Sequence, residues 1–370
     1  MKRALLCSAF AALLTGCGLC PSPPSAATGT AARYPITDVA TAPATPVRNQ
    51  AKSGTCWAFG GVSLIESEAI RTRRCTLDLS EMWVVRHAYF EKAVKYVRTR
   101  GRVAFDQGGE IQDVLWLVDR YGIVPQSLYE GGAADGTYDH ASLAKAIRRL
   151  AKRIVDKKLY EKEHWQRMID EELDRRLGAR PDRFVIDGVA YTPFSYADSI
   201  GFRRDDYVAL TSFTHHPFFE RFVLEIPDNW AAHATLNIPL DSLMRLLDSA
   251  LAAGYTAAWD ADVSERGFGR RAGIALLPQQ EGRITLPAPE IVVDQPLRQR
   301  MFDTQATTDD HVMHIVGTAV DSLGNSYYKV KNSWGERAGR HGYWYASRLC
   351  RRQNHRISTP PRRSGRRSRR

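Results

Sequence analysis

The sequence has few cysteines, and their spacing is irregular. Only six occur in 370 residues, and no CxxC pair is accompanied by a histidine partner. A disulfide framework needs an even set of cysteines in a short chain, and structural zinc needs clustered cysteine and histidine ligands. We therefore expect neither of these, no other metal site and no cofactor. The adjacent His215 and His216 precede Pro217 and are interpreted as a loop pair.

The N-terminal apolar stretch is too short to cross a membrane. It covers only the eleven residues 4–14, whereas a spanning helix needs about 20. Lys2 and Arg3 precede it, and Leu14-Thr15-Gly16-Cys17 at its end resembles a bacterial lipobox. Together these features are typical of a lipoprotein-type signal peptide over residues 1–17 that is cleaved before Cys17.

The lipobox implies that Cys17 carries a lipid and anchors the protein to a membrane of the bacterial cell envelope. Residues 18–38 would form a flexible tether, because the segment up to Ala32 is rich in Pro, Ser, Ala, Thr and Gly. The alternative is an ordinary secretory signal that is cleaved near Ala26-Ala27.

Net positive charge is small outside the C-terminal tail. The net charge is +11, but residues 351–370 hold nine arginines and no acid, which leaves +2 for the other 350 residues. A nucleic-acid partner is therefore not expected. The segment 348–370 also lacks apolar periodicity, so we expect a disordered tail, either a natural extension or the product of a frameshift.

The most informative segment of the chain surrounds Cys56. Gln50 precedes this cysteine by six residues, Ser53-Gly54-Thr55 leads into it, and helical spacing follows it. A thiol at a helix N-terminus is favoured as the thiolate, which is the nucleophilic form. A lone cysteine in a helix is also often a small buried hydrophobe, so Cys56 alone does not decide the function.

The distant part of the chain supplies two partners for such a thiol. Asp310-His311 opens a strand-like segment, and Asn332 lies in Lys331-Asn332-Ser333-Trp334-Gly335 at the end of another. A cysteine, a histidine and an asparagine are the components of a thiolate–imidazolium nucleophile with an orienting amide. We expect Cys56 and His311 to rest as this ion pair.

The order Gln50, Cys56, His311, Asn332 and the residues around each resemble the papain-like cysteine peptidases. The branch most similar is that of bleomycin hydrolase and its aminopeptidases, because Ser53 replaces a disulfide cysteine. The catalytic pair is also separated by 311 − 56 = 255 residues. Compact members place the histidine about 130–150 residues downstream, so roughly 100 residues are inserted here. The likeness covers about residues 39–347.

The resemblance assigns further roles. It implies that the oxyanion receives hydrogen bonds from Gln50 Nε2 and the Cys56 backbone N–H, and that Asn332 orients His311. Gly108, Gly109 and Trp334 would contact the substrate. The alternatives are a simple turn for the two glycines and, for Trp334, shielding of that hydrogen bond or packing alone. His314, three residues after His311, is interpreted as structural because it should face the other side of the strand.

The fold class that follows is α+β, a papain-like two-lobe fold with a helical lobe, a β-sheet or barrel-like lobe and the active site in the cleft between them. The peptidase domain would span 39–347 with a helical insertion at about 126–225. Helices are expected at 55–74, 81–98, 110–121, 143–177 and 241–253, and strands at 222–226, 255–260, 310–317, 327–335 and 343–347.

The function expected from these features is hydrolysis of peptide or protein substrates by a cysteine-type aminopeptidase. In the similar branch, exopeptidase action depends on the chain's own C-terminus blocking part of the cleft, and the C-terminus here differs. A papain-like endopeptidase is therefore the first alternative. A non-catalytic remnant with an altered C-terminus is the second. The oligomeric state is not indicated by the sequence.

Overall fold

A computed structural model describes residues 34–103, 105–132, 137–279, 289–348 and 356–359. The first three long helices are α1 (Cys56–Arg73), α2 (Glu81–Arg98) and α3 (Ile111–Tyr121), which confirms the helices expected there. The Ser80 hydroxyl caps α2 by accepting a hydrogen bond from the Trp83 N–H. Gly122, with a φ of 70°, closes α3 in a conformation that glycine adopts easily.

Helix α1 is buried almost all round, because other elements approach it from two sides. A side chain at Gly60 would come within 2.8 Å of Val312 on β10 (His311–Asp321), and one at Gly61 within 2.6 Å of Val114 on α3. Glycines at these two positions therefore let the strand and the helix pack directly against the α1 backbone. This position brings the N-terminus of α1 next to the start of β10.

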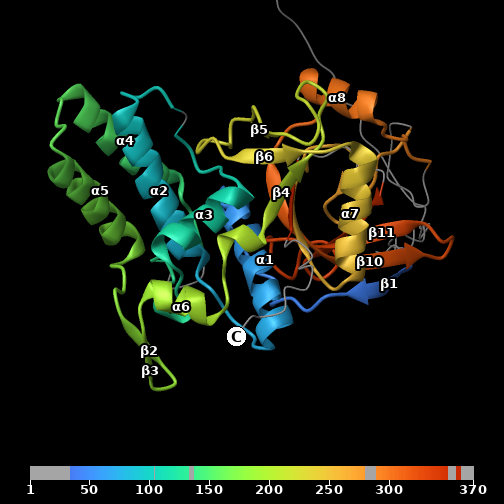
Figure 1. Ribbon diagram of the computed structural model, residues 1–370, viewed down its shortest axis with the longest axis horizontal. Coiled ribbons are helices and arrows are strands. Elements are labelled where there is room, and N and C mark those ends of the chain that lie inside the picture. Colours follow the sequence, from blue (N-terminus) through green and yellow to red (C-terminus); the bar gives the residue numbers. More distant parts are fainter. Residues whose placement is uncertain (1–33, 104, 133–136, 280–288, 349–355, 360–370) are drawn as a thin grey trace, which may run out of the picture. The chain divides into compact units, whose positions relative to one another are not determined.

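The expected insertion contains two helices rather than one, α4 (Ala141–Asp156) and α5 (Lys162–Leu177). Each buries an apolar stripe, including Leu143 and Ile147 on α4, and both helices lie alongside α2 (Figure 1). Arg86 of α2 is fully buried and pairs with the Asp170 carboxylate of α5 at 3.0 Å. The ion pair and the apolar stripes thus fix α4 and α5 to the helical lobe.

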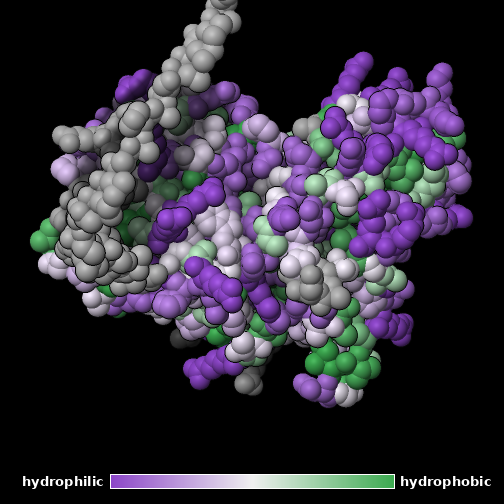
Figure 2. All heavy atoms as spheres, turned by 180° about the vertical axis from the view of Figure 1, so that it is seen from behind, coloured by the Kyte–Doolittle hydropathy of each residue, from purple (hydrophilic) through white to green (hydrophobic). Residues whose placement is uncertain are grey.

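Several short elements connect the long helices and the sheet. A hairpin of β2 (Phe184–Ile186) and β3 (Val189–Tyr191) leads into α6 (Pro193–Ser199). Single turns of 3₁₀ helix cover Gln126–Leu128 and Arg204–Asp206. Figure 2 shows a mostly hydrophilic surface with an apolar tip at the hairpin, where Val185 is 65% exposed.

The second lobe is built on one sheet in the order β5-β6-β4-β13-β7-β10-β11-β12-β9-β8, with β1 also paired to β10. Helix α7 (Leu240–Ala252) packs on it, close to the expected bounds, and α8 is Gln295–Asp303. The strands not yet given are β1 (Ile36–Thr41), β4 (Val208–Thr211), β5 (Arg221–Val223), β6 (Ala234–Asn237), β7 (Ala257–Ala261), β8 (Phe268–Gly269), β9 (Ile274–Ala275), β11 (Ser326–Lys331), β12 (Tyr343–Ser347) and β13 (Arg356–Thr359).

Two expectations about the chain's ends are wrong in part. The tether expected over 18–38 runs into β1, which starts at Ile36 and pairs with β10 through its backbone. The tail expected to be disordered over 348–370 contributes β13, which pairs with β4 on one side and β7 on the other. Both segments gain ladder hydrogen bonds, which need no apolar periodicity.

The expected signal peptide and Cys17 lie outside the described residues, as do 349–355 and 360–370. Across the residues that are described, no helix combines the length and the hydropathy needed to cross a membrane.

Candidate active site

The loop that carries the nucleophile is held by Gln107. The Gln107 side-chain carbonyl accepts the Gly54 N–H at 2.8 Å, and its backbone carbonyl accepts the Trp57 indole N–H at 3.0 Å. Gly54 is also tightly packed, since a side chain there would lie 3.1 Å from Gln107 Cβ. These contacts fix Cys56 as the first residue of α1, where the helix N-terminus faces its sulfur.

His311 is oriented by Asn332. The histidine Nε2 and the asparagine Oδ1 are 2.8 Å apart and buried, and the same oxygen accepts the Ser333 N–H at 2.7 Å. Because Oδ1 already accepts from one backbone donor, Nε2 must be the nitrogen that donates. In the neutral ring Nδ1 is then left as the acceptor, the atom that can take a proton from a thiol.

Gln50 is fixed by an equally specific pair of contacts. Its Oε1 accepts the Ser333 hydroxyl at 2.5 Å, and its Nε2 donates to the Ser53 carbonyl at 2.7 Å. These bonds determine which end of the amide carries nitrogen. The Gln50 Nε2 has two N–H groups, and only one of them is used in the bond to Ser53. The second N–H is the donor that can serve a bound group.

Gln50, Cys56 and His311 line one cleft between the helical and β lobes, with a volume of about 650 Å³. Gly108 lies on the same cleft, and so do exposed side chains of α4 such as Arg148. Basic side chains of α4, Lys145 and Arg148, therefore reach the rim of the site. Asn332 lies behind His311 and does not line the cleft.

Burial dominates the ionisation of the two reacting groups. It raises the pKa of the Cys56 thiol to about 12 and lowers the pKa of His311 to about 4. The backbone N–H groups of Val312 and Trp57 act in the opposite direction on the thiol, and Asn332 does so on His311. Neither group therefore ionises alone; transfer of one proton between them creates both charges together, and their attraction offsets the burial.

Two residues expected at the substrate lie elsewhere. The Trp334 ring lies 4.6 Å from the His311 ring and 5.1 Å from the Arg270 guanidinium, so it covers the histidine. Gly109 is buried, and a side chain there would come within 2.9 Å of Trp57. Gly109 thus allows packing behind the cleft, and Gly108 is the glycine at the cleft surface.

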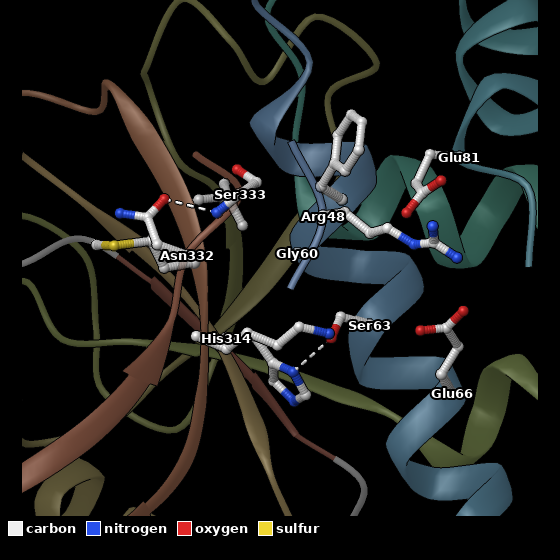
Figure 3. A pocket seen from close by; sticks show the side chains of 12 residues that line it. Arg48, Gly60, Ser63, Glu66, Glu81, His314, Asn332 and Ser333 are labelled. Atoms are coloured by element: carbon white, nitrogen blue, oxygen red, sulfur yellow. Dashed lines mark hydrogen bonds between the residues drawn. The ribbon is translucent and has the colours of Figure 1, made fainter. Parts of the chain in front are cut away.

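His314 belongs to a buried polar network between α1 and β10, about two turns along α1 from Cys56. Its Nδ1 is 2.9 Å from the Ser63 hydroxyl, which also accepts from Lys331 Nζ at 2.8 Å. The network lines a small buried cavity. Figure 3 shows His314 and Ser63 facing one another there, with Glu66 and Glu81 beyond them. His314 therefore contacts α1 at Ser63 and does not line the cleft.

This network joins the three elements that carry the site. Thr45 donates to Glu66 Oε2 at 2.5 Å and accepts from Lys331 at 2.9 Å, and Glu66 Oε1 accepts the Leu79 N–H. Lys331 immediately precedes Asn332. The lead-in to α1, α1 itself and β11 are therefore cross-linked by buried polar contacts one residue from the orienting amide.

Within the described residues, His215, His216 and Glu225 are the one group whose ligand atoms could converge on a metal. Gln299 argues against that use. Its Oε1 accepts the Thr214 N–H at 2.6 Å, so its Nε2 faces His215 Nδ1 at 3.0 Å as a donor. This leaves the proton on His215 Nε2, which bonds Glu225 at 3.2 Å.

A thiol at a helix N-terminus, beside an imidazole that an amide orients, defines a cysteine-nucleophile hydrolase. The papain family cysteine protease model matches residues 35–167, and the peptidase C1-like family model matches residues 186–351. The chain belongs to the papain-like cysteine peptidases.

The relatives and one solved structure agree with this. Aminopeptidase C of Lactococcus lactis subsp. cremoris is 24% identical over 343 residues, covering 82% of this chain and 77% of its own. Aminopeptidase G of Lactobacillus delbrueckii subsp. lactis is 25% identical over 352 residues, covering 82% and 78%. PepW from Lactobacillus rhamnosis HN001 shares the fold, with a TM-score of 0.69, 20% identity and coverage of 88% and 82%.

Proposed function

We propose that this cysteine peptidase acts as an aminopeptidase and that Gln50, Cys56, His311 and Asn332 carry its chemistry. The observation that carries the proposal is the bond from His311 Nε2 to Asn332 Oδ1 at 2.8 Å, in a protein whose Cys56 and His311 line one cleft. That bond leaves Nδ1 of His311 free to serve the thiol. The similarity to aminopeptidases C and G supports exopeptidase action.

In the proposed mechanism, Cys56 passes its proton to His311 and attacks the carbonyl carbon of the peptide bond. The developing oxyanion receives hydrogen bonds from Gln50 Nε2 and from the Cys56 backbone N–H. His311 then gives the proton to the leaving amine. Water, activated by the same histidine, hydrolyses the thioester and restores the thiol.

Hydrolysis of paired fluorogenic substrates tests this proposal. Wild-type protein should cleave aminoacyl and short peptidyl amides, and Cys56→Ala should cleave neither while unfolding at the same temperature. Labelling of Cys56 by an epoxide-type thiol inhibitor gives a second measure of the reactive thiol. Equal hydrolysis by Cys56→Ala would contradict the assigned nucleophile, whereas absence of labelling would indicate a non-catalytic remnant.

We also propose that the protein is a lipoprotein of the bacterial cell envelope, anchored through Cys17. Lys2, Arg3 and the sequence Leu14-Thr15-Gly16-Cys17 support this. Metabolic labelling with a fatty-acid analogue should mark the wild type, and Cys17→Ser should release unlabelled protein into the soluble fraction. Label that persists in Cys17→Ser would exclude the lipobox, and Cys20→Ser provides the matched control.

A further inference from the structure

One carboxylate in the catalytic cleft has no role in the mechanism above. Asp228 lies in the loop between β5 and β6, and it lines the cleft together with Cys56 and His311. Its carboxylate rests against the backbone of Gly108, so closely that a side chain at Gly108 would collide with it. The absence of a side chain at Gly108 therefore makes room for the acid of a segment about 120 positions later.

Among the described residues, no cationic side chain forms an ion pair with Asp228. In the part of the chain that the structure describes, it takes part in no hydrogen bond or ion pair. Lys92 is the positive group near it, but the Lys92 ammonium donates to the backbone carbonyls of Asp106 and Gly108. Lys145 and Arg148 line the same cleft from α4, and neither pairs with Asp228.

The surroundings of Asp228 are acidic. Burial and the nearby carboxylates of Asp309, Asp106 and Asp113 raise the pKa of Asp228 to about 7, against the opposing effect of Lys92. A half-buried carboxylate among other acids is stabilised by a cation that enters the cleft. Because Asp228 lines the same cleft as Cys56, this cation would be part of the bound substrate.

We infer that Asp228 binds the free α-ammonium group of the substrate and so selects peptides with an unblocked N-terminus. This inference rests on the proposed function, since it deepens the aminopeptidase activity of the same cleft. A peptide's α-ammonium has three donors and a positive charge, which fit an unpaired carboxylate. A blocked N-terminus would instead bring an uncharged acyl group against the acid and leave the carboxylate without a partner.

The same contact would also favour the nucleophile. The negative charge of Asp228 raises the pKa of the Cys56 thiol. When an ammonium group neutralises that charge, this effect is removed and the thiolate becomes easier to form. Binding of the correct substrate end thus promotes ionisation of the thiol that attacks it.

Kinetics of Asp228→Asn with three substrates test the inference: an alanyl amide, its N-acetyl form and its desamino form. The variant should lose about 10- to 100-fold in kcat/KM for the free amine, because a charge-assisted hydrogen bond is lost. The other two substrates should be unaffected or improve. Asp228→Glu should recover part of the loss, and Asp187→Asn, in the β2–β3 turn, is the matched control that should change nothing.

Protection of Cys56 from iodoacetamide provides a readout that needs no turnover. Alanine amide should protect the wild type better than N-acetylalanine amide does, and Asp228→Asn should abolish the difference. A preference for the free amine that survives in Asp228→Asn would overturn the inference while leaving the proposed function intact. A loss confined to substrates with Lys or Arg side chains would also overturn it, because Asp228 would then bind a side chain.

Failure of the proposed function has a different signature. In that case the wild type would hydrolyse none of the three substrates, or Cys56→Ala would hydrolyse them as well as the wild type. The protection experiment would still show whether a free amino group binds beside Asp228.

Discussion

His311 donates its Nε2 proton to Asn332 Oδ1 across 2.8 Å in the buried region behind the cleft. The bond joins the first residue of β10 to the residue that follows β11. Pairing of these strands, with His314 opposite Lys331, sets the distance between the two side chains. The orientation of the imidazole is therefore a property of the sheet register, and the Trp334 ring keeps it from water.

The first prediction concerns which histidine activates Cys56. In His311→Ala, burial acts on the thiol without the neighbouring base, so the pKa of Cys56 should rise and its alkylation by iodoacetamide should shift to more alkaline pH. The rate of alkylation, followed by intact mass against pH, measures this. His314→Ala should keep the wild-type profile, because His314 contacts Ser63 and not the cleft. The reverse pattern would assign the base to His314.

The second prediction concerns the oxyanion. Gln50→Ala should lower kcat by about 10²–10³ with a small change in KM, because one donor to the developing charge is removed. Ser333→Ala should have a smaller effect in the same direction, since Ser333 only holds the Gln50 amide in place. Gln126→Ala is the control, a glutamine whose amide contacts Tyr138 instead. An increase in KM with an unchanged kcat would instead mean that Gln50 binds the substrate in the ground state.

The sequence predicted the parts of the site that short motifs encode, and it missed those that tertiary contacts create. Gln50, Cys56 and His311 meet in one cleft as expected. Asp228 gave no signal, because its place beside Gly108 depends on how the loop after β5 returns to the helical lobe.

The same difference between local signals and tertiary contacts applies to the fold. The bounds of α2 could be predicted from apolar periodicity and from the Ser80 cap, since both signals are local. Strand β13 has four residues, and its structure depends on unpaired edges of β4 and β7 that come far earlier in the chain. Short strands of this kind carry no periodic pattern and could not be predicted from the sequence.

The third prediction concerns the buried acid beside Arg48 and Glu66 in Figure 3. Burial, and then the charge of Glu66, raise the pKa of Glu81 from the ordinary 4.5 to about 8. The folded protein therefore binds more protons than the unfolded chain between these values. Glu81 thus contributes stability that is present below about pH 4.5 and is lost as the pH rises to about 8.

Glu81→Gln should reduce the decrease in the free energy of unfolding with rising pH, because the amide keeps the shape of the neutral acid and has no proton to lose. Urea unfolding at a series of pH values between 5 and 8 measures the free energy of unfolding for both proteins. Glu171→Gln, on the exposed face of α5, should leave the slope unchanged. A slope in Glu81→Gln equal to that of the wild type would show that Glu81 does not titrate in this range.

The last prediction concerns the tail. Strand β13 lies between β4 and β7, and β7 is buried along its whole length. Removing residues 356–370 would leave backbone N–H and C=O groups of two strands without ladder partners in a buried region. We expect the truncated protein to melt at least about 5 °C below the wild type. It should also lose activity, since β7 pairs with β10 at His311. Removing only residues 361–370 keeps β13 and should change little. If both truncations melt like the wild type, the arginine-rich segment contributes nothing to the sheet, and the register of β10 must be held by β1, β7 and β11 alone.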